Sequence, residues 1–272
     1  FPAEGTLLPD TYRFQTGDTR SDIIERMQVG QQKFLAKMWE ERDPDVVVKT
    51  PEEAIVLASI VEKETGRADE RPRIAAVFSN RLKKKMRLQS DPTIIYGLVA
   101  GQGALDHPIQ QDELDRDTPY NTYKIDGLPP GPIANPGRAA IEAVLKPAKT
   151  KDLYFVADGK GGHAFAPSLD DHNKNVQKWR VVEREIRARE AAEAAAAAEA
   201  AKAAGVVPPD ATLPGGTSEA APPADVVGQT GATPKPLEII RTPSPEAPAS
   251  ASAGAATPAG AEPPLPRRNP NR

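Results

Sequence analysis

The chain of 272 residues contains no cysteine, and aromatic residues make up only 5% of it. The lack of cysteine excludes a disulfide framework, a zinc site with thiolate ligands and a thiol nucleophile. His107, His163 and His172 are scattered and lack a second ligand at helical spacing, so we expect loop and surface histidines and no metal site. No Gly-x-Ser-x-Gly or Walker motif occurs, which argues against those hydrolase and nucleotide-binding classes.

The sequence also lacks a strong excess of one charge and a long hydrophobic run. Its formal net charge is −3 at pH 7, which argues against a general nucleic-acid-binding protein. We interpret the basic run at 81–87 mainly as the solvated end of a helix, with attraction to an anionic polymer as the alternative. No signal peptide or membrane-spanning stretch is recognisable. Because the chain begins with Phe1 rather than Met, we expect a fragment or a processed form that could have lost an upstream anchor.

Composition divides the chain into three parts. Trp179 is the last aromatic residue, and 15 of the 29 prolines lie at or after Pro208. A segment of that composition buries too little apolar surface to offset the entropy lost on ordering. We therefore expect a folded domain at 1–182, a projecting Ala/Glu-rich helix at 183–204 and a disordered Pro/Ala-rich tail at 205–272.

Apolar periodicity and capping signals predict an α+β fold that is rich in helix. The strong strand at 153–157 and the segment 163–166 predict a β-hairpin around the Gly-rich turn 158–162, and 122–125 predicts a further short strand. The predicted helices span 19–40, 51–66, 69–85, 94–99, 109–115, 137–145 and 168–204.

An apolar helix that runs directly into a carboxylate is the most informative feature of the sequence. Positions three, four and seven residues before Glu64 are Val61, Ile60 and Leu57, so Glu64 continues an apolar stripe. Glu62 lies roughly 200° away around the helix axis and is the better candidate for a surface residue. Desolvation raises the pKa of a carboxyl group, which suits it to act as a general acid on a glycosidic bond. The alternative is that Glu64 only marks where the stripe leaves the core.

Three polar loops, at 87–93, 119–123 and 128–133, mix aromatic, amide, Gly and Pro residues. Aromatic rings stack on sugar rings, and amides form hydrogen bonds with hydroxyl and N-acetyl groups. Because binding groups often lie on loops of a helical scaffold, these loops are candidates for glycan binding. Turns that only pack on the core are the alternative.

Six motifs, taken in order, closely resemble the endolytic murein transglycosylases of the YceG-like family over about residues 1–180. The first includes Glu4-Gly5 and Leu8-Pro9-Asp10-Thr11-Tyr12, and the second includes Glu62-Lys63-Glu64-Thr65. The six motifs lie at 4–12, 58–65, 87–93, 120–123, 127–133 and 154–163. The resemblance implies a helix-rich, lytic-transglycosylase-like catalytic domain at 1–182.

The implied reaction is non-hydrolytic cleavage of the β-1,4 bond between N-acetylmuramic acid and N-acetylglucosamine, which leaves 1,6-anhydro ends. Glu64 matches the catalytic glutamate of the family and would serve as acid and then as base, without a cofactor or a metal. Gln89, Tyr120, Asn121 and Tyr123 are expected to position the glycan or to stabilise positive charge at C1. We interpret Asp91 mainly as a helix cap.

The resemblance further implies a bacterial protein with a single-pass anchor in the inner membrane and a catalytic domain in the periplasm. Its substrate would be nascent peptidoglycan, whose strand elongation it would limit, and penicillin-binding proteins would be partners. The alternative is a catalytically idle glycan-binding scaffold that recruits cell-wall synthases through the 168–204 helix. A hydrolytic muramidase is a further option, and it would need a second carboxylate, for which Asp91 is the candidate.

Overall fold

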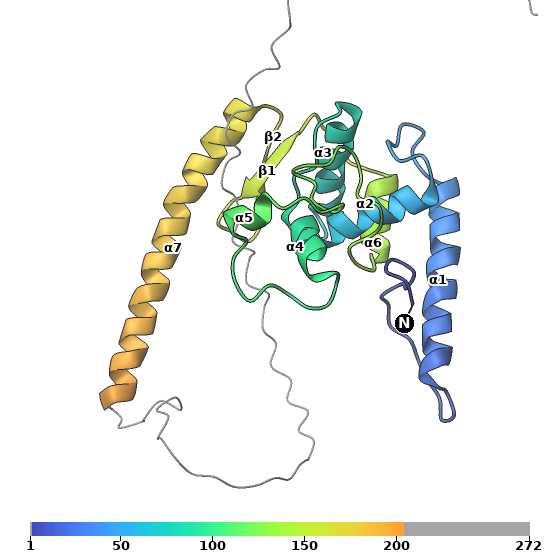
Figure 1. Cartoon of the computed structure of the whole chain (residues 1–272), viewed down its shortest axis with the longest axis horizontal. Helices are drawn as coiled ribbons and strands as arrows, with labels where there is room; N and C mark the ends of the chain where they lie inside the picture. Colours follow the sequence, from blue (N-terminus) through green and yellow to red (C-terminus); the bar gives the residue numbers. More distant parts are fainter. Residues whose placement is uncertain (1, 204–272) are drawn as a thin grey trace, which may run out of the picture. The chain divides into compact units, whose positions relative to one another are not determined.

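The computed structural model describes residues 2–203, which form seven helices and one two-stranded antiparallel sheet (Figure 1). This arrangement confirms the predicted helix-rich α+β fold with a small hairpin. None of the helices in the described range combines the length and the apolar character that a membrane crossing requires. The elements are α1 (Arg20–Glu40), α2 (Pro51–Glu64), α3 (Arg71–Lys83), α4 (Asp91–Val99), α5 (Gln111–Leu114), α6 (Arg138–Leu145), β1 (Tyr154–Ala157), β2 (His163–Ala166) and α7 (Leu169–Ala203).

The core of the domain lies where α2, α3 and α6 pack on one another. Helix α2 begins as its sequence predicts, because the Thr50 side chain accepts a hydrogen bond from the backbone of Glu53 at 3.2 Å and Pro51 is the first helical residue. Every residue from Ala54 to Val61 is buried. Since all faces of this segment are covered, α2 is the central helix of the domain rather than an amphipathic surface helix.

The hairpin of β1 and β2 joins this core through aromatic contacts. Phe155 pairs with Phe165 across the two strands, and its ring meets the ring of Phe78 from α3 edge-on, with the ring centroids 5.9 Å apart. The first part of α7 packs on the outer side of the hairpin, where Val176 is buried. The turn of the hairpin lies next to the start of α3, because the backbone N–H of His163 donates to Glu70 Oε1 at 2.9 Å.

Two predicted elements differ from the structure. The segment 122–125 is a turn rather than a strand, because the backbone of Asn121 accepts hydrogen bonds from the N–H groups of Lys124 and Ile125 at 2.9 and 3.0 Å. Helix α4 begins three residues before the predicted start, at Asp91, so Asp91 is its first helical residue and Ser90 is its N-cap. The prediction that Asp91 caps this helix is therefore wrong.

Helix α7 is continuous through the boundary predicted at 182/183. Some of its side chains are buried or partly buried as far as Ile186, whereas all of those from Arg187 to Ala200 are exposed. Burial thus decreases close to the predicted boundary, although the division into domains stays a prediction. The predicted tail at 205–272 lies outside the described residues.

We expect Leu57→Ala to destabilise the protein strongly, because Leu57 is completely buried in α2 and its loss leaves a cavity. Such changes cost about 2–5 kcal/mol in the free energy of unfolding, which chemical denaturation measures. Val29→Ala is the matched control: this residue of α1 is 38% exposed, and its truncation should cost less than about 1 kcal/mol. Equal losses for the two variants would contradict a core centred on α2.

Candidate active site

Glu64 is the last residue of α2, and the apolar stripe before it is buried as predicted. Leu57, Ile60 and Val61 are each 0% exposed, whereas Glu64 itself is only partly buried. The chain leaves the helix at Thr65, which is extended and whose hydroxyl accepts a hydrogen bond from the backbone of Arg67 at 3.0 Å. The carboxyl group therefore stands at the edge of the core, where one side is apolar and the other is accessible.

The hydroxyl of Ser90 holds the carboxyl group of Glu64. Ser90 Oγ donates a hydrogen bond to Glu64 Oε1 at 2.5 Å. Ser90 is the N-cap of α4, but its side chain makes no capping bond to that helix. An N-cap serine normally accepts a hydrogen bond from a backbone N–H in the first turn of the helix. The Ser90 hydroxyl binds Glu64 instead, so α4 lacks this capping bond.

Two buried threonine hydroxyl groups hold Ser90 in place in turn. Thr122 Oγ1 accepts a hydrogen bond from the backbone N–H of Ser90 at 2.9 Å, and Thr93 Oγ1 donates one to the Ser90 carbonyl at 2.6 Å. The two threonine hydroxyls are 2.9 Å from each other. All three residues are at most 2% exposed, so the donor to Glu64 is rigidly placed.

Burial raises the pKa of Glu64 to about 7, and it is the largest of the influences on that group. The hydrogen bond from Ser90 lowers the pKa, the negative charge of Asp91 raises it and the positive charge of Arg81 lowers it. Since desolvation prevails, Glu64 is poised between its protonated and ionised forms near neutral pH. A carboxyl group of this kind can both donate and accept a proton.

Asp91 and Tyr123 form a second pair in the same region. Tyr123 Oη donates to Asp91 Oδ1 at 2.5 Å, and burial raises the pKa of both groups. The charge of Asp91 raises the pKa of Glu64, and the charge of Glu64 raises that of Tyr123. The predicted site residue Tyr123 therefore belongs to the electrostatic surroundings of Glu64.

Gln89 occupies the turn just before Ser90. It has a φ of 53°, a left-handed conformation that is uncommon for a residue other than glycine. Its backbone N–H donates to the Thr122 carbonyl at 3.1 Å, and its Oε1 accepts from Arg81 Nη1 at 3.1 Å. The predicted contact of Gln89 with glycan stays a prediction.

The other two predicted residues have different surroundings. Asn121 is 1% exposed, and its amide donates to the carbonyls of Leu114 and Arg116 at 2.9 and 2.8 Å, so it holds the loop together. Tyr120 is partly buried, with its ring 4.7 Å from that of Tyr96 between centroids. A direct contact of either residue with glycan stays a prediction, and for Asn121 the geometry favours a structural role.

Ser90 is the partner of Glu64 but was not among the predicted site residues, and the solvated position expected for Arg81 is wrong. The basic run at 81–87 was interpreted as the solvated end of a helix, but Arg81 is only 8% exposed. A signal was present: Phe78, Val77 and Ile74 precede Arg81 by three, four and seven residues, the same spacing that singled out Glu64.

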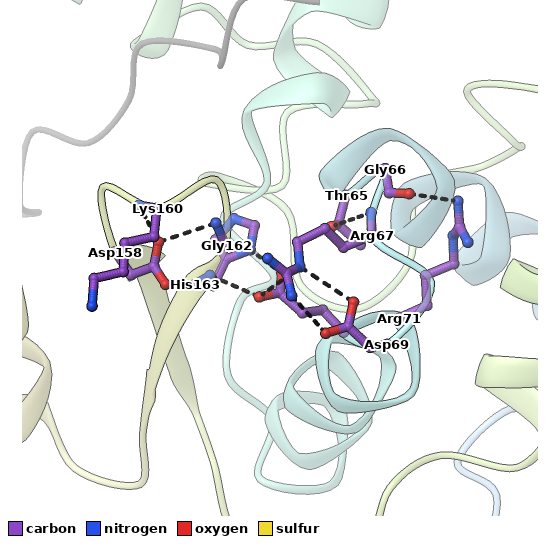
Figure 2. Close-up of polar contacts among 10 residues, drawn as sticks. Thr65, Gly66, Arg67, Asp69, Arg71, Asp158, Lys160, Gly162 and His163 are labelled. Atoms are coloured by element: carbon purple, nitrogen blue, oxygen red, sulfur yellow. Dashed lines mark hydrogen bonds and ion pairs between the residues drawn. The ribbon is translucent and has the colours of Figure 1, made fainter.

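The segment after Glu64 is anchored to the turn of the hairpin (Figure 2). Both carboxylate oxygens of Glu70 bind His163, one at its backbone N–H at 2.9 Å and the other at Nδ1 at 2.7 Å. Gly162 leaves the room for this contact, because a Cβ there would lie 2.5 Å from Glu70 Oε1. His163 is therefore a partly buried anchor, and the expectation of a surface histidine was wrong, as it was for the buried His172.

Glu62 also has a structural contact rather than a purely solvated position. Its Oε2 accepts a hydrogen bond from the backbone N–H of Gly137 at 3.1 Å, at the N-terminus of α6. An acidic side chain at a helix N-terminus is favoured by the helix dipole. The two glutamates at the end of α2 thus face different partners, as their separation around the helix predicts.

Comparisons with known proteins give one family and several relatives. The model of the YceG-like family matches residues 1–178. An endolytic murein transglycosylase of Bacillus subtilis strain 168 is 42% identical over 179 residues, which are 65% of this chain and 48% of the relative. An endolytic murein transglycosylase of Streptococcus pneumoniae serotype 2 strain D39 is 37% identical over 180 residues, 64% of this chain and 31% of the relative. The chain therefore spans about half the length of the first relative and less of the second.

A solved structure shares both sequence and fold with this chain. The crystal structure of a YceG-like protein from Listeria monocytogenes has a TM-score of 0.53 and 39% sequence identity. The match covers 62% of this chain and 54% of the other.

We expect Glu64→Gln to stabilise the protein at alkaline pH but not at acid pH. The raised pKa means that the folded state binds the Glu64 proton more tightly than the unfolded chain, so the wild type loses stability as pH rises from about 4.5 to about 7. Glutamine avoids this loss, so the variant should equal the wild type at about pH 4 and exceed it by roughly 3 kcal/mol at about pH 8. Chemical unfolding at both pH values measures this difference, and equal stability at the higher pH would contradict the desolvation of Glu64.

Proposed function

This chain belongs to the YceG-like family, and from that premise we propose that it is an endolytic lytic transglycosylase of peptidoglycan with Glu64 as its acid and base. The observation that carries the proposal is the carboxyl group of Glu64, which is desolvated at the end of a buried helix and held by Ser90. The names of the relatives from B. subtilis and S. pneumoniae support the same activity.

In the first step, protonated Glu64 donates its proton to the glycosidic oxygen that leaves C1 of N-acetylmuramic acid. Because Ser90 donates its hydrogen bond to Oε1, Oε2 is the oxygen that carries the proton toward the substrate. The bond between C1 and that oxygen breaks, and positive charge develops at C1. Burial favours the protonated form of Glu64 that this step requires.

In the second step, the Glu64 carboxylate accepts the proton of the C6 hydroxyl of the same sugar. The C6 oxygen forms a bond to C1, and the 1,6-anhydro ring closes without water. The nucleophile belongs to the substrate, so its effective concentration is high and no second carboxylate has to activate a water. The proton that Glu64 lost is restored, and the enzyme returns to its starting state.

We propose that the predicted glycan-binding residues contribute to this reaction in different ways. Gln89 and Tyr123 are linked to the neighbours of Glu64, through Arg81 and Asp91 respectively. Tyr120 offers an aromatic ring on which a sugar could stack. Asn121 supports the loop that carries Thr122 and Tyr123, which is an indirect contribution to binding.

The cellular setting follows from the family resemblance. We propose that the catalytic part faces the periplasm from a single-pass anchor in the inner membrane and acts on nascent glycan strands to limit their elongation. Penicillin-binding proteins are the proposed partners. Their recruitment would bring the cleavage to newly synthesised strands.

We expect Glu64→Gln to lower the release of products with 1,6-anhydromuramic ends by at least about 10²-fold, since a general acid and base contributes that much or more. Mass spectrometry of digested glycan strands measures the products. The matched control is Glu62→Gln, which lies two residues away and keeps an oxygen that can accept from Gly137, and it should retain activity.

Three outcomes of this experiment separate the alternatives. Loss of anhydro products with glycan binding retained supports the transglycosylase. Unchanged cellular function of Glu64→Gln would favour the idle scaffold and contradict our proposal. Products heavier by one water would identify a hydrolytic muramidase, with Asp91 as the second carboxylate to test.

A further inference from the structure

Arg81 is a buried cation that donates hydrogen bonds to neutral oxygens of the backbone and of Gln89. The residue lies near the C-terminal end of α3, is 8% exposed, and its guanidinium carbon is 5.1 Å from the ring centroid of Tyr154. Burial of a guanidinium is costly, and it lowers the pKa of Arg81. Because packing alone does not offset this cost, we expect the Arg81 charge to have a further role, which its contacts indicate.

The guanidinium joins the α3–α4 loop to the start of the hairpin. Its Nε donates to the carbonyl of Leu153 at 2.7 Å, just before β1. Its Nη1 donates to the carbonyls of Arg87 and Leu88 at 3.1 and 3.0 Å and to Gln89 Oε1 at 3.1 Å. Only a planar side chain with several donors in a fixed fork can reach these acceptors together, and lysine lacks that geometry.

The loop that Arg81 holds is the one that presents Ser90 to Glu64. Gln89 adopts a left-handed conformation directly before Ser90, and such a conformation persists where surrounding contacts impose it. Arg81 supplies the contact to the Gln89 side chain, while Thr122 supplies the contacts to the backbone on either side of it. The position of the Ser90 hydroxyl thus depends on both Arg81 and Thr122.

The positive charge of Arg81 also acts on Glu64. It lowers the pKa of Glu64, against burial and against the negative charge of Asp91, while Ser90 acts in the same direction as Arg81. Of the other titratable groups near this cation, Tyr123 and Tyr154 interact with it through their charges, and His172 has its pKa lowered by it. Arg81 is therefore the cation that favours the ionised form of the candidate acid.

We propose that Arg81 is a positioning residue of this active site, whose fork fixes the Gln89–Ser90 turn against Glu64 and whose charge stabilises the Glu64 carboxylate between its two proton transfers. The proposal rests on the proposed transglycosylase activity for its role in turnover. Its structural and electrostatic parts concern the protein without substrate. They can therefore be tested even if the activity is a different one.

The test compares Arg81→Lys and Arg81→Gln in the full chain. Lysine keeps the charge and loses the fork, while glutamine loses the charge and keeps an amide donor. The control is Lys83→Gln, which removes a positive charge from an exposed position two residues further along α3. The Glu64 pKa is measured by carboxyl ¹³C NMR without substrate, with Glu64→Gln to assign the signal. Turnover, its pH dependence and thermal unfolding are measured in parallel.

We expect the Glu64 pKa to rise in Arg81→Gln, to stay near the wild-type value in Arg81→Lys and to be unchanged in Lys83→Gln. Turnover should fall by roughly 10²-fold in both Arg81 variants, because a small displacement of catalytic groups has an effect of that size. The alkaline limb of the pH–rate profile should shift to higher pH in Arg81→Gln alone, because Glu64 then stays protonated to higher pH.

A merely structural Arg81 would lower the melting temperature of both variants without moving the Glu64 pKa, and that result would overturn the proposal. Wild-type turnover in folded Arg81→Lys would overturn the positioning role, and this variant decides the question if Arg81→Gln does not fold. Absence of anhydro products from the wild type would refute the proposed function instead, while the NMR titration would still decide the electrostatic role of Arg81.

Discussion

The burial of one carboxyl group at the C-terminal end of α2 is the constraint on which the rest of the site depends. The apolar residues of α2 withdraw Glu64 from water, and this raises its pKa to about 7 although Ser90 and Arg81 act in the opposite direction. A fully solvated glutamate would be almost entirely ionised at neutral pH and would be a poor acid. A fully buried one without a hydrogen bond would be a poor base. The combination of an apolar side and a single strong donor lets one group exchange a proton in both directions.

Several residues around Glu64 have conformations or environments that are unusual for their residue type, and these residues hold the loop that contacts the carboxyl group. Ser90 stands at the N-cap of α4 but makes no capping bond, Gln89 is left-handed, and Arg81 is a cation within the core. Each of these features carries a cost in stability, and each contributes to the contact between the α3–α4 loop and Glu64. Such departures are expected at functional sites, where local rules yield to the geometry of the reaction. The helices α2, α3 and α6 provide the packed core that offsets these costs.

The strongly periodic elements were predictable because helices and hairpins follow from local spacing. Helix α2, with its Thr50 cap and Pro51, and the hairpin of β1 and β2 agree with prediction to within two residues. The segment 122–125 did not, since its turn depends on hydrogen bonds to the backbone of Asn121, whose side chain donates to carbonyls at the end of α5 and just after it. The alternating polarity of this short segment does not predict that contact.

The sequence alone determined that Glu64 ends a buried stripe, because the period of a helix converts the spacing of apolar residues into a face of the structure. The same spacing was present at Arg81, where a neighbouring run of basic residues obscured it. Only the tertiary structure decided what these two side chains meet. Ser90 lies 26 positions after Glu64, and Tyr123 lies 32 positions after Asp91. Hydrogen bonds over such separations depend on how loops are brought together by the packing of distant helices, which no local pattern encodes.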